Sequence, residues 1–190
     1  MLFHAGFSWM SGGYLGVSVF FTLSGFLITS LLLAEHRATG TIAVGRFYTR
    51  RAKRLLPAAL FWLAVVCVLA AFDVFSGVPN LRRDVLGAVL QVFNWVKLSS
   101  GESYADLNAA AAGLRHPLDH FWSLSVEQQF YWLWPVAFLA LAAFARRRRT
   151  SPAWTVGVVT VAFCAAAPVI AVVWGPDAAY WATPARLGEI

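Results

Sequence analysis

Long apolar runs separated by short polar segments dominate the sequence. Tyr14–Ala34 is an uncharged run of 21 residues, which as a helix crosses a hydrocarbon core of about 30 Å. Three further runs have a similar length: Leu55–Phe75, Phe121–Ala145 and Ala153–Trp174. The pattern predicts an all-α protein, a polytopic transmembrane helix bundle with four full spans in this chain.

A shorter apolar run, Val85–Leu98, has 14 residues. A helix of that length covers about 21 Å and is too short to cross a bilayer unaided. We therefore expect one short re-entrant or interfacial helix here. In the preceding span, Leu55–Phe75, we expect Pro57 to lie in the first turn.

The basic residues support this topology. Six lie in the predicted loop Glu35–Arg54 and four in Arg146–Arg149, and such clusters are typical of cytoplasmic loops. The two loops lie on one side of the membrane only if Val85–Leu98 does not cross it. The segments expected to face outward are then Ala5–Gly13, Ser76–His120 and the stretch from Gly175.

Composition agrees with a membrane protein. Hydrophobic residues make up 59% of the chain and charged residues 13%, against about 45–50% and about 25% in soluble domains. The net charge of +6 comes from residues between apolar runs, so we expect a lipid bilayer and no nucleic acid as partner. Cys67 and Cys164 lie within apolar runs, are far apart and lack metal-ligand spacing. The sequence predicts that they are small core residues and that the chain holds no metal.

One span carries a carboxylate, Glu127. A charged group at the centre of a membrane helix costs about 2.5–3.5 kcal/mol on insertion scales, so it should face protein or water. Spacings of three or four place a polar stripe on one face of this helix: His120, Ser123 or Leu124, Glu127, Tyr131 and Trp134. Alternatively, Glu127 is a hydrogen-bonding contact between helices, and the aromatic residues form an interfacial belt.

Two other features could carry chemistry. His4 precedes a glycine-rich turn, and histidine is suited to proton transfer near neutral pH, although a lone terminal histidine can be incidental. The basic segment 50–54 is either a topology anchor or a group of phosphate contacts. The sequence has no P-loop, dinucleotide fingerprint, GxSxG elbow or zinc motif.

Three segments together resemble the successive signatures of the membrane acyltransferase-3 family: Gly16–Thr29, Phe47–Pro57 and His120–Pro135. Ala185–Glu189 resembles the start of a further family motif. These are bacterial integral-membrane O-acyltransferases of surface polysaccharides, peptidoglycan and related acceptors. The resemblance runs from His4 to Glu189 and implies that residues 1–190 are the N-terminal part of one acyltransferase-3 membrane domain, truncated at both ends.

The resemblance also implies an activity. A multi-pass enzyme of the bacterial inner membrane would transfer an acyl group, most often acetyl, from acetyl-CoA to a hydroxyl of an extracytoplasmic glycan. Acyl-CoA is the donor substrate, and no cofactor is bound permanently.

Roles follow for particular residues. The resemblance makes His4 a general base or transient acyl acceptor, and makes Glu127 a second catalytic residue that orients a base or lines the acceptor passage. Arg51 and Arg54 match a cytoplasmic pair expected to contact CoA phosphates. The rest of the polar stripe would line the acceptor channel: His120, Ser123 and Tyr131.

Two alternatives stay open at this point. The chain could be a subunit of a polytopic transporter or flippase, in which Glu127 and His120 relay protons. It could also be a catalytically inactive, truncated remnant of an acyltransferase. Dependence on CoA distinguishes an acyltransferase from a transporter.

Overall fold

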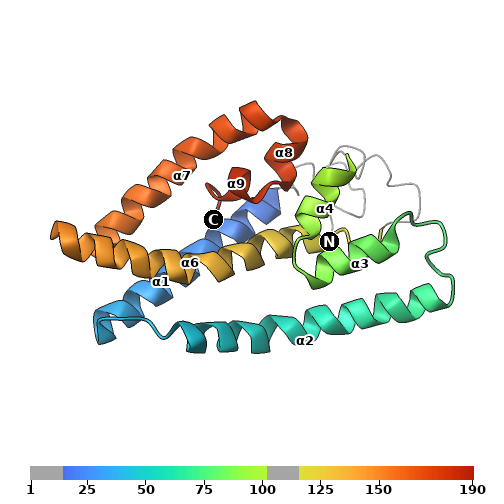
Figure 1. The fold of residues 1–190 in the computed structure, drawn as a ribbon, viewed down its shortest axis with the longest axis horizontal. Coiled ribbons are helices and arrows are strands. Elements are labelled where there is room, and N and C mark those ends of the chain that lie inside the picture. The colour runs from blue at the N-terminus through green and yellow to red at the C-terminus, as the bar shows by residue number, and fades with distance from the viewer. Residues whose placement is uncertain (1–14, 102–115) are drawn as a thin grey trace.

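The computed structural model describes residues 15–101 and 116–190, which form helices joined by short connections (Figure 1). No strand occurs within these two ranges, so the all-α prediction is confirmed. The helices are α1 (Leu15–Thr39), α2 (Val44–Ala71), α3 (Leu81–Val89), α4 (Phe93–Ser100), α6 (Phe121–Arg148), α7 (Pro152–Trp174), α8 (Pro176–Trp181) and α9 (Thr183–Arg186).

Three of the described helices are long and apolar enough to cross a membrane: Gly16–Thr39 in α1, Val44–Ala71 in α2 and Pro152–Trp174 in α7. The fourth expected span corresponds to α6, whose 28 residues extend for about 42 Å. Its first half carries Ser125, Glu127 and Gln128, all buried by neighbouring helices. Thus α6 is long enough to span but is more polar than the other three, because it lies at the centre of the bundle.

The contacts between α1 and α6 advance together along both helices. Moving toward their C-termini, the pairs are Phe21 with Trp122, Ser24 with Glu127, Thr29 with Trp134 and His36 with Phe138. The two helices therefore run in the same direction, cross at an angle, and keep one register from Phe21 and Trp122 to His36 and Phe138 (Figure 1). Since α1 can span a membrane, this register places α6 at the same depth.

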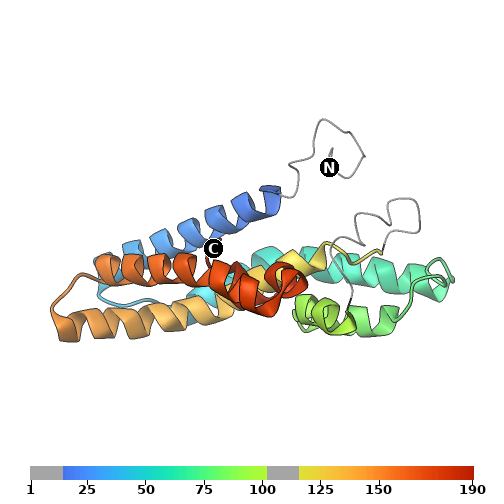
Figure 2. The ribbon, with the colours of Figure 1, turned by 90° about the horizontal axis from the view of Figure 1, so that it is seen from above.

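Both basic segments lie at one end of the bundle. The connection from α1 to α2 and that from α6 to α7 occur at the same end in both views (Figures 1 and 2). This arrangement agrees with the prediction that the two segments share one side of the membrane. At the end of α6, arginines in the last turn also interact favourably with the helix dipole.

The predicted loop Glu35–Arg54 is wrong in its extent. Glu35 still belongs to α1, and α2 already begins at Val44, so a connection of four residues replaces the expected long loop. Arginine and lysine are good helix formers, and the helices continue beyond the apolar segment. For the same reason Pro57 lies in the interior of α2, not in its first turn.

The predicted single helix at Val85–Leu98 is two helices. α3 and α4 form a hairpin broken at Gln91, which has a left-handed φ of 58°. Gly87 allows their close approach, because a Cβ there would lie 2.7 Å from the Val96 side chain. With nine and eight residues, neither helix is long enough to span a bilayer.

The stretch after Gly175 folds as α8 and α9 against α4, α6 and α7, and its expected outward position stays a prediction. Trp181 is fully buried and packs edge-on against Trp122 of α6. Asn94, also fully buried, donates from Nδ2 to the Trp181 carbonyl at 2.9 Å and to Thr183 Oγ1 at 3.0 Å. Gln129 donates in turn to Asn94 Oδ1 at 2.9 Å.

The prediction that Cys67 and Cys164 are core residues is wrong. Both are free and exposed, and the Cys164 thiol donates to the Gly188 carbonyl at 3.3 Å. Exposed apolar side chains are common on the same two helices, including Phe61 on α2 and Val172 on α7. In a membrane helix the lipid-facing surface is as apolar as the interior, so hydrophobicity alone does not separate the two.

The Asn94 network predicts a test of packing. Asn94→Ala should lower the unfolding temperature by about 5 °C, because it leaves the Trp181 carbonyl and the Gln129 amide without their buried partner, at a cost of about 2 kcal/mol. Thermal unfolding of the protein in detergent measures this. Ser100→Ala, at the exposed end of α4, is the control, since its hydroxyl donates to the Lys97 carbonyl of the same helix. Equal unfolding temperatures for both variants would contradict the role given to Asn94.

Candidate active site

Glu127 is buried between α1 and α6, with 3% of its surface exposed. Its Oε1 accepts a hydrogen bond of 2.6 Å from Ser24 Oγ of α1 and a second from the Tyr131 hydroxyl. Ser24 lies near the middle of a helix that can span the membrane, so the carboxylate lies within the apolar layer. A buried carboxylate needs such donors, because its desolvation is otherwise uncompensated.

Tyr131 connects this carboxylate to a cation on α2. It lies one turn after Glu127 on α6, so its hydroxyl reaches the carboxylate along the same helix face. The guanidinium carbon of Arg51 lies 4.9 Å from the centre of the Tyr131 ring and 5.7 Å from that of Phe47. A guanidinium at this distance is attracted to the face of an aromatic ring. The side chains of Arg51, Tyr131, Glu127 and Ser24 therefore form one continuous chain of contacts across three helices.

Two further contacts hold α1 and α2 against α6 at this level. The Tyr48 hydroxyl of α2 donates to the Trp132 carbonyl at 2.6 Å, three residues before Pro135, where the proline interrupts the ladder of α6. Trp134 Nε1 donates to Thr29 Oγ1 of α1 at 2.9 Å. The position of Arg51 relative to Glu127 is thus defined by contacts on both sides of the site.

A cavity of about 460 Å³ opens between α1 and α2. Its residues are of three kinds: apolar side chains, three arginines and one carboxylate. They are Leu31, Leu32, Ala34, Phe47, Arg50, Arg51, Arg54 and Glu35. Guanidinium groups bind phosphates through paired hydrogen bonds, and the apolar wall can contact a hydrocarbon chain. The cavity therefore suits a ligand that has both phosphate groups and an apolar part.

Arg51 belongs to both features, since it lines the cavity and lies over the Tyr131 ring. A ligand in the cavity would consequently be one side chain away from Tyr131 and two from Glu127. Chemically, the arrangement offers phosphate-binding cations at one end and a hydrogen-bonded carboxylate at the other.

The predicted site residues separate into two groups. Glu127, Tyr131 and Arg51 come together, and Arg54 lines the same cavity. His120 is exposed at the start of α6, about 10 Å before Glu127 along the helix axis. The Ser123 hydroxyl, which belongs to the first turn of α6, donates to the His120 carbonyl at 3.2 Å. The structure therefore joins only the inner part of the predicted polar stripe.

His4 lies outside the described residues, so its role stays a prediction. Glu127 does contact a neighbouring helix, as the simpler interpretation of that residue expected, and this contact is compatible with a catalytic role. Trp132 is exposed whereas Trp134 is buried, so the tryptophans of this segment do not all fit an interfacial belt.

Sequence reasoning missed Ser24, Thr29 and Glu35. Ser24 and Thr29 are small polar residues in an apolar run, where such residues commonly face the interior. Their partners on α6 are more than 100 residues away in the chain, so the pairing depends on the register of the two helices. Glu35 was assigned to a loop, although it lies on α1 and lines the cavity.

A second charged cluster lies among α3, α4 and the segment that leads into α6. His116 Nε2 is 2.7 Å from Asp84 Oδ2, and Lys97 Nζ is 3.7 Å from Asp119 Oδ1. His116 Nδ1 accepts from the Leu118 amide at 3.3 Å. Because both ring nitrogens of His116 face a partner, this cluster anchors the chain before α6.

Comparison with known proteins gives a consistent result. The model of the acyltransferase-3 family, described as an acyltransferase domain, matches residues 1–186. O-acetyltransferase OatA of Staphylococcus aureus (strain NCTC 8325 / PS 47) is 39% identical over 141 residues, which is 74% of this chain and 23% of that protein. Peptidoglycan O-acetyltransferase OatA of Listeria monocytogenes is 36% identical over 144 residues, or 76% of this chain and 22% of that protein. The chain thus spans less than a quarter of the length of these relatives, and no solved structure matches it.

Proposed function

The chain belongs to the acyltransferase-3 family, and from that membership we propose that it is part of a multi-pass O-acetyltransferase of the bacterial inner membrane. The enzyme transfers an acetyl group from acetyl-CoA to a hydroxyl of an extracytoplasmic glycan. Peptidoglycan is the proposed acceptor, because the named Listeria relative is a peptidoglycan O-acetyltransferase. One observation carries the proposal: contacts run without a break from the basic cavity, through Arg51 and Tyr131, to the buried Glu127.

The cavity supports the choice of donor. Acetyl-CoA has a diphosphate and a further phosphate at one end and a long arm that ends in the thioester, in which methyl and methylene groups alternate with two amides. Arg51 and Arg54 would bind phosphates at the cytoplasmic end of α2, where the basic segments of the chain gather. Leu31 and Leu32 of α1 would contact the arm. The thioester would then point from the cavity toward Tyr131.

The reaction needs a base and a way to stabilise charge. The acceptor oxygen attacks the thioester carbonyl, a C–O bond forms, the C–S bond breaks and CoA leaves as the thiol. The proton of the acceptor hydroxyl passes to His4, which acts as the general base and then gives this proton to the departing CoA sulfur. Glu127 orients that base or lines the passage that the acceptor enters. His120 and Ser123, nearer the outer end of α6, would line the passage along with Tyr131.

The catalytic roles can be tested by acetyl transfer in the full-length protein. Glu127→Gln keeps the size and the hydrogen-bond acceptor but removes the charge, and His4→Ala removes the base. Each should lower transfer from labelled acetyl-CoA in membrane vesicles by about 100-fold or more. Membrane insertion of both variants should be unchanged.

Ser100→Ala is the control for this assay, since Ser100 lies on α4 away from the site. Transfer at the wild-type rate by either test variant would remove that residue from the mechanism. A wild-type protein that moves glycans without any dependence on acetyl-CoA would instead support a transporter.

The donor site predicts a different kinetic effect. Arg54→Ala should raise the KM for acetyl-CoA by about tenfold, because one charge-assisted hydrogen bond to a phosphate is lost. Its kcat should change by less than about twofold, since Arg54 does not contact the Glu127 cluster in the described part of the chain. Steady-state kinetics at saturating acceptor measure both values.

Arg147→Ala is the matched control, because Arg147 is at the same end of the bundle but does not line the cavity. A KM that is unchanged in Arg54→Ala, or raised equally in Arg147→Ala, would contradict phosphate binding in this cavity.

A further inference from the structure

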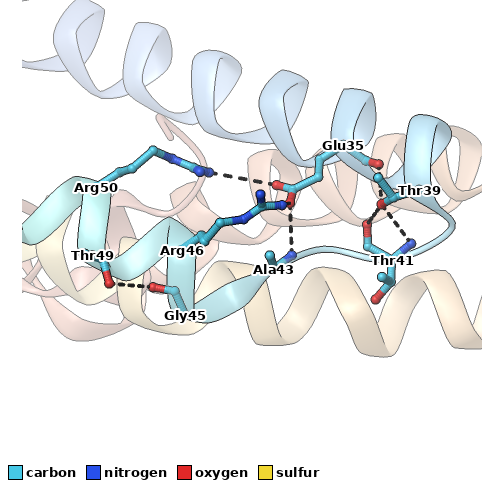
Figure 3. A network of polar contacts seen from close by, with 8 residues as sticks. All are labelled: Glu35, Thr39, Thr41, Ala43, Gly45, Arg46, Thr49 and Arg50. Carbon is cyan, nitrogen blue, oxygen red and sulfur yellow. Dashed lines mark hydrogen bonds and ion pairs between the residues drawn. The ribbon is translucent and has the colours of Figure 1, made fainter.

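Glu35 is a carboxylate in a cavity otherwise suited to anions. Its Oε1 accepts from Arg46 Nη2 at 3.2 Å and from the Ala43 amide at 3.1 Å, and its Oε2 lies 3.9 Å from Arg50 Nη2 (Figure 3). Both arginines extend from α2 toward this one side chain, which comes from the last turns of α1. Glu35 thus occupies the position between guanidinium groups and a helix N-terminus that a phosphate oxygen would favour.

The contacts of Glu35 differ in how easily they can be exchanged. The side chains of Arg46 and Arg50 are 70% and 61% exposed, whereas that of Glu35 is 19% exposed. Ion pairs with such exposed arginines contribute little, since water and salt screen them. Both guanidinium groups can therefore turn to another anion without a large cost, while Glu35 stays on the Ala43 amide.

The net charge of the cavity also depends on Glu35. Three arginines and one carboxylate line it, so the carboxylate offsets one of three positive charges. An anionic ligand in the cavity meets repulsion from Glu35 as well as attraction from the arginines. Glu35 therefore places a negative charge in the cavity before any ligand binds.

We propose that Glu35 is a built-in competitor for the phosphate groups of the donor: it holds Arg46 and Arg50 before CoA binds, and it releases Arg50, which lines the cavity, when CoA binds. The inference rests on the proposed function, in which this cavity binds acetyl-CoA. Donor and product carry the same phosphates, so Glu35 weakens the binding of both. Release of the product limits turnover in many enzymes. Weaker binding of CoA would let it leave faster after each transfer.

Glu35→Gln tests the effect of the negative charge without disturbing the fold. The glutamine side chain has the same length, and its carbonyl oxygen can still accept from the Ala43 amide, so the start of α2 is retained. Only the negative charge and its hold on the two arginines are lost. Asp73→Asn is the matched control, because it makes the same chemical change just beyond the opposite end of α2. Asp73 has a φ of 58°, which asparagine also tolerates.

The experiment measures CoA binding to the full-length protein in nanodiscs by isothermal titration calorimetry. Glu35→Gln should bind CoA about three- to tenfold more tightly than wild type at low salt, with a smaller difference at about 0.5 M salt, because added ions screen the lost repulsion. Asp73→Asn should match wild type. In turnover, Glu35→Gln should be inhibited by CoA at a lower concentration.

Equal or weaker binding of CoA by folded Glu35→Gln would overturn the inference and would make Glu35 a residue that positions the arginines. The donor site itself would stand in that case. A folded wild-type protein that does not bind CoA would overturn the inference and the proposed donor together. If Glu35→Gln does not fold, Glu35→Ala serves as the second variant, and tighter CoA binding by it is the supporting result.

Discussion

The described structure depends on one constraint, the burial of the Glu127 carboxylate at the level of the membrane. Such a group is tolerated only where donors surround it, so α6 must keep Ser24 of α1 on one side and its own Tyr131 on the other. This requirement selects one register between α1 and α6. Aromatic contacts above and below, from Phe21 to Trp122 and from His36 to Phe138, agree with that register.

The same helix organises the rest of the chain. α2 is tied to α6 by Tyr48 and Arg51, and the α3–α4 hairpin and the C-terminal helices meet it through the Asn94 and Gln129 amides. Among the described helices, α6 carries the most buried polar side chains: Ser125, Glu127 and Gln128. These polar residues make α6 less hydrophobic than the other long helices. Glu127 and other polar groups of α6 also form the hydrogen bonds that hold neighbouring helices against it.

Sequence reasoning identified the helices and the central carboxylate because both have strong local signals. Apolar runs of about 20 residues predict spans, and a lone Glu127 within one of them predicts a buried polar site. The sequence could not predict features that depend on residues distant in the chain but close in the fold. The apolar run predicts a span from Leu55, whereas α2 begins at Val44, because basic residues can continue a helix beyond its apolar segment. Ser24 and Glu35 were missed because their roles depend on partners brought close by the fold.

In the proposed function, the basic cavity and the buried carboxylate serve one reaction. Arg51 lines the cavity and lies against Tyr131, which contacts Glu127. A ligand bound to Arg51 would therefore be separated from Glu127 by Tyr131 alone. Chemistry that starts from a cytoplasmic donor and ends on an outer acceptor needs such a connection. α1 and α6 run in the same direction and share one register, so the contacts from Arg51 to Glu127 lie along the length of both helices.

A cryo-electron microscopy structure of the full-length protein with acetyl-CoA tests the central claim most directly. The account predicts phosphate density against Arg51 and Arg54 in the cavity between α1 and α2, with the thioester arm directed toward Tyr131 and Glu127. Acetyl-CoA bound elsewhere, with this cavity empty and Arg51 still stacked on Tyr131, would contradict the account.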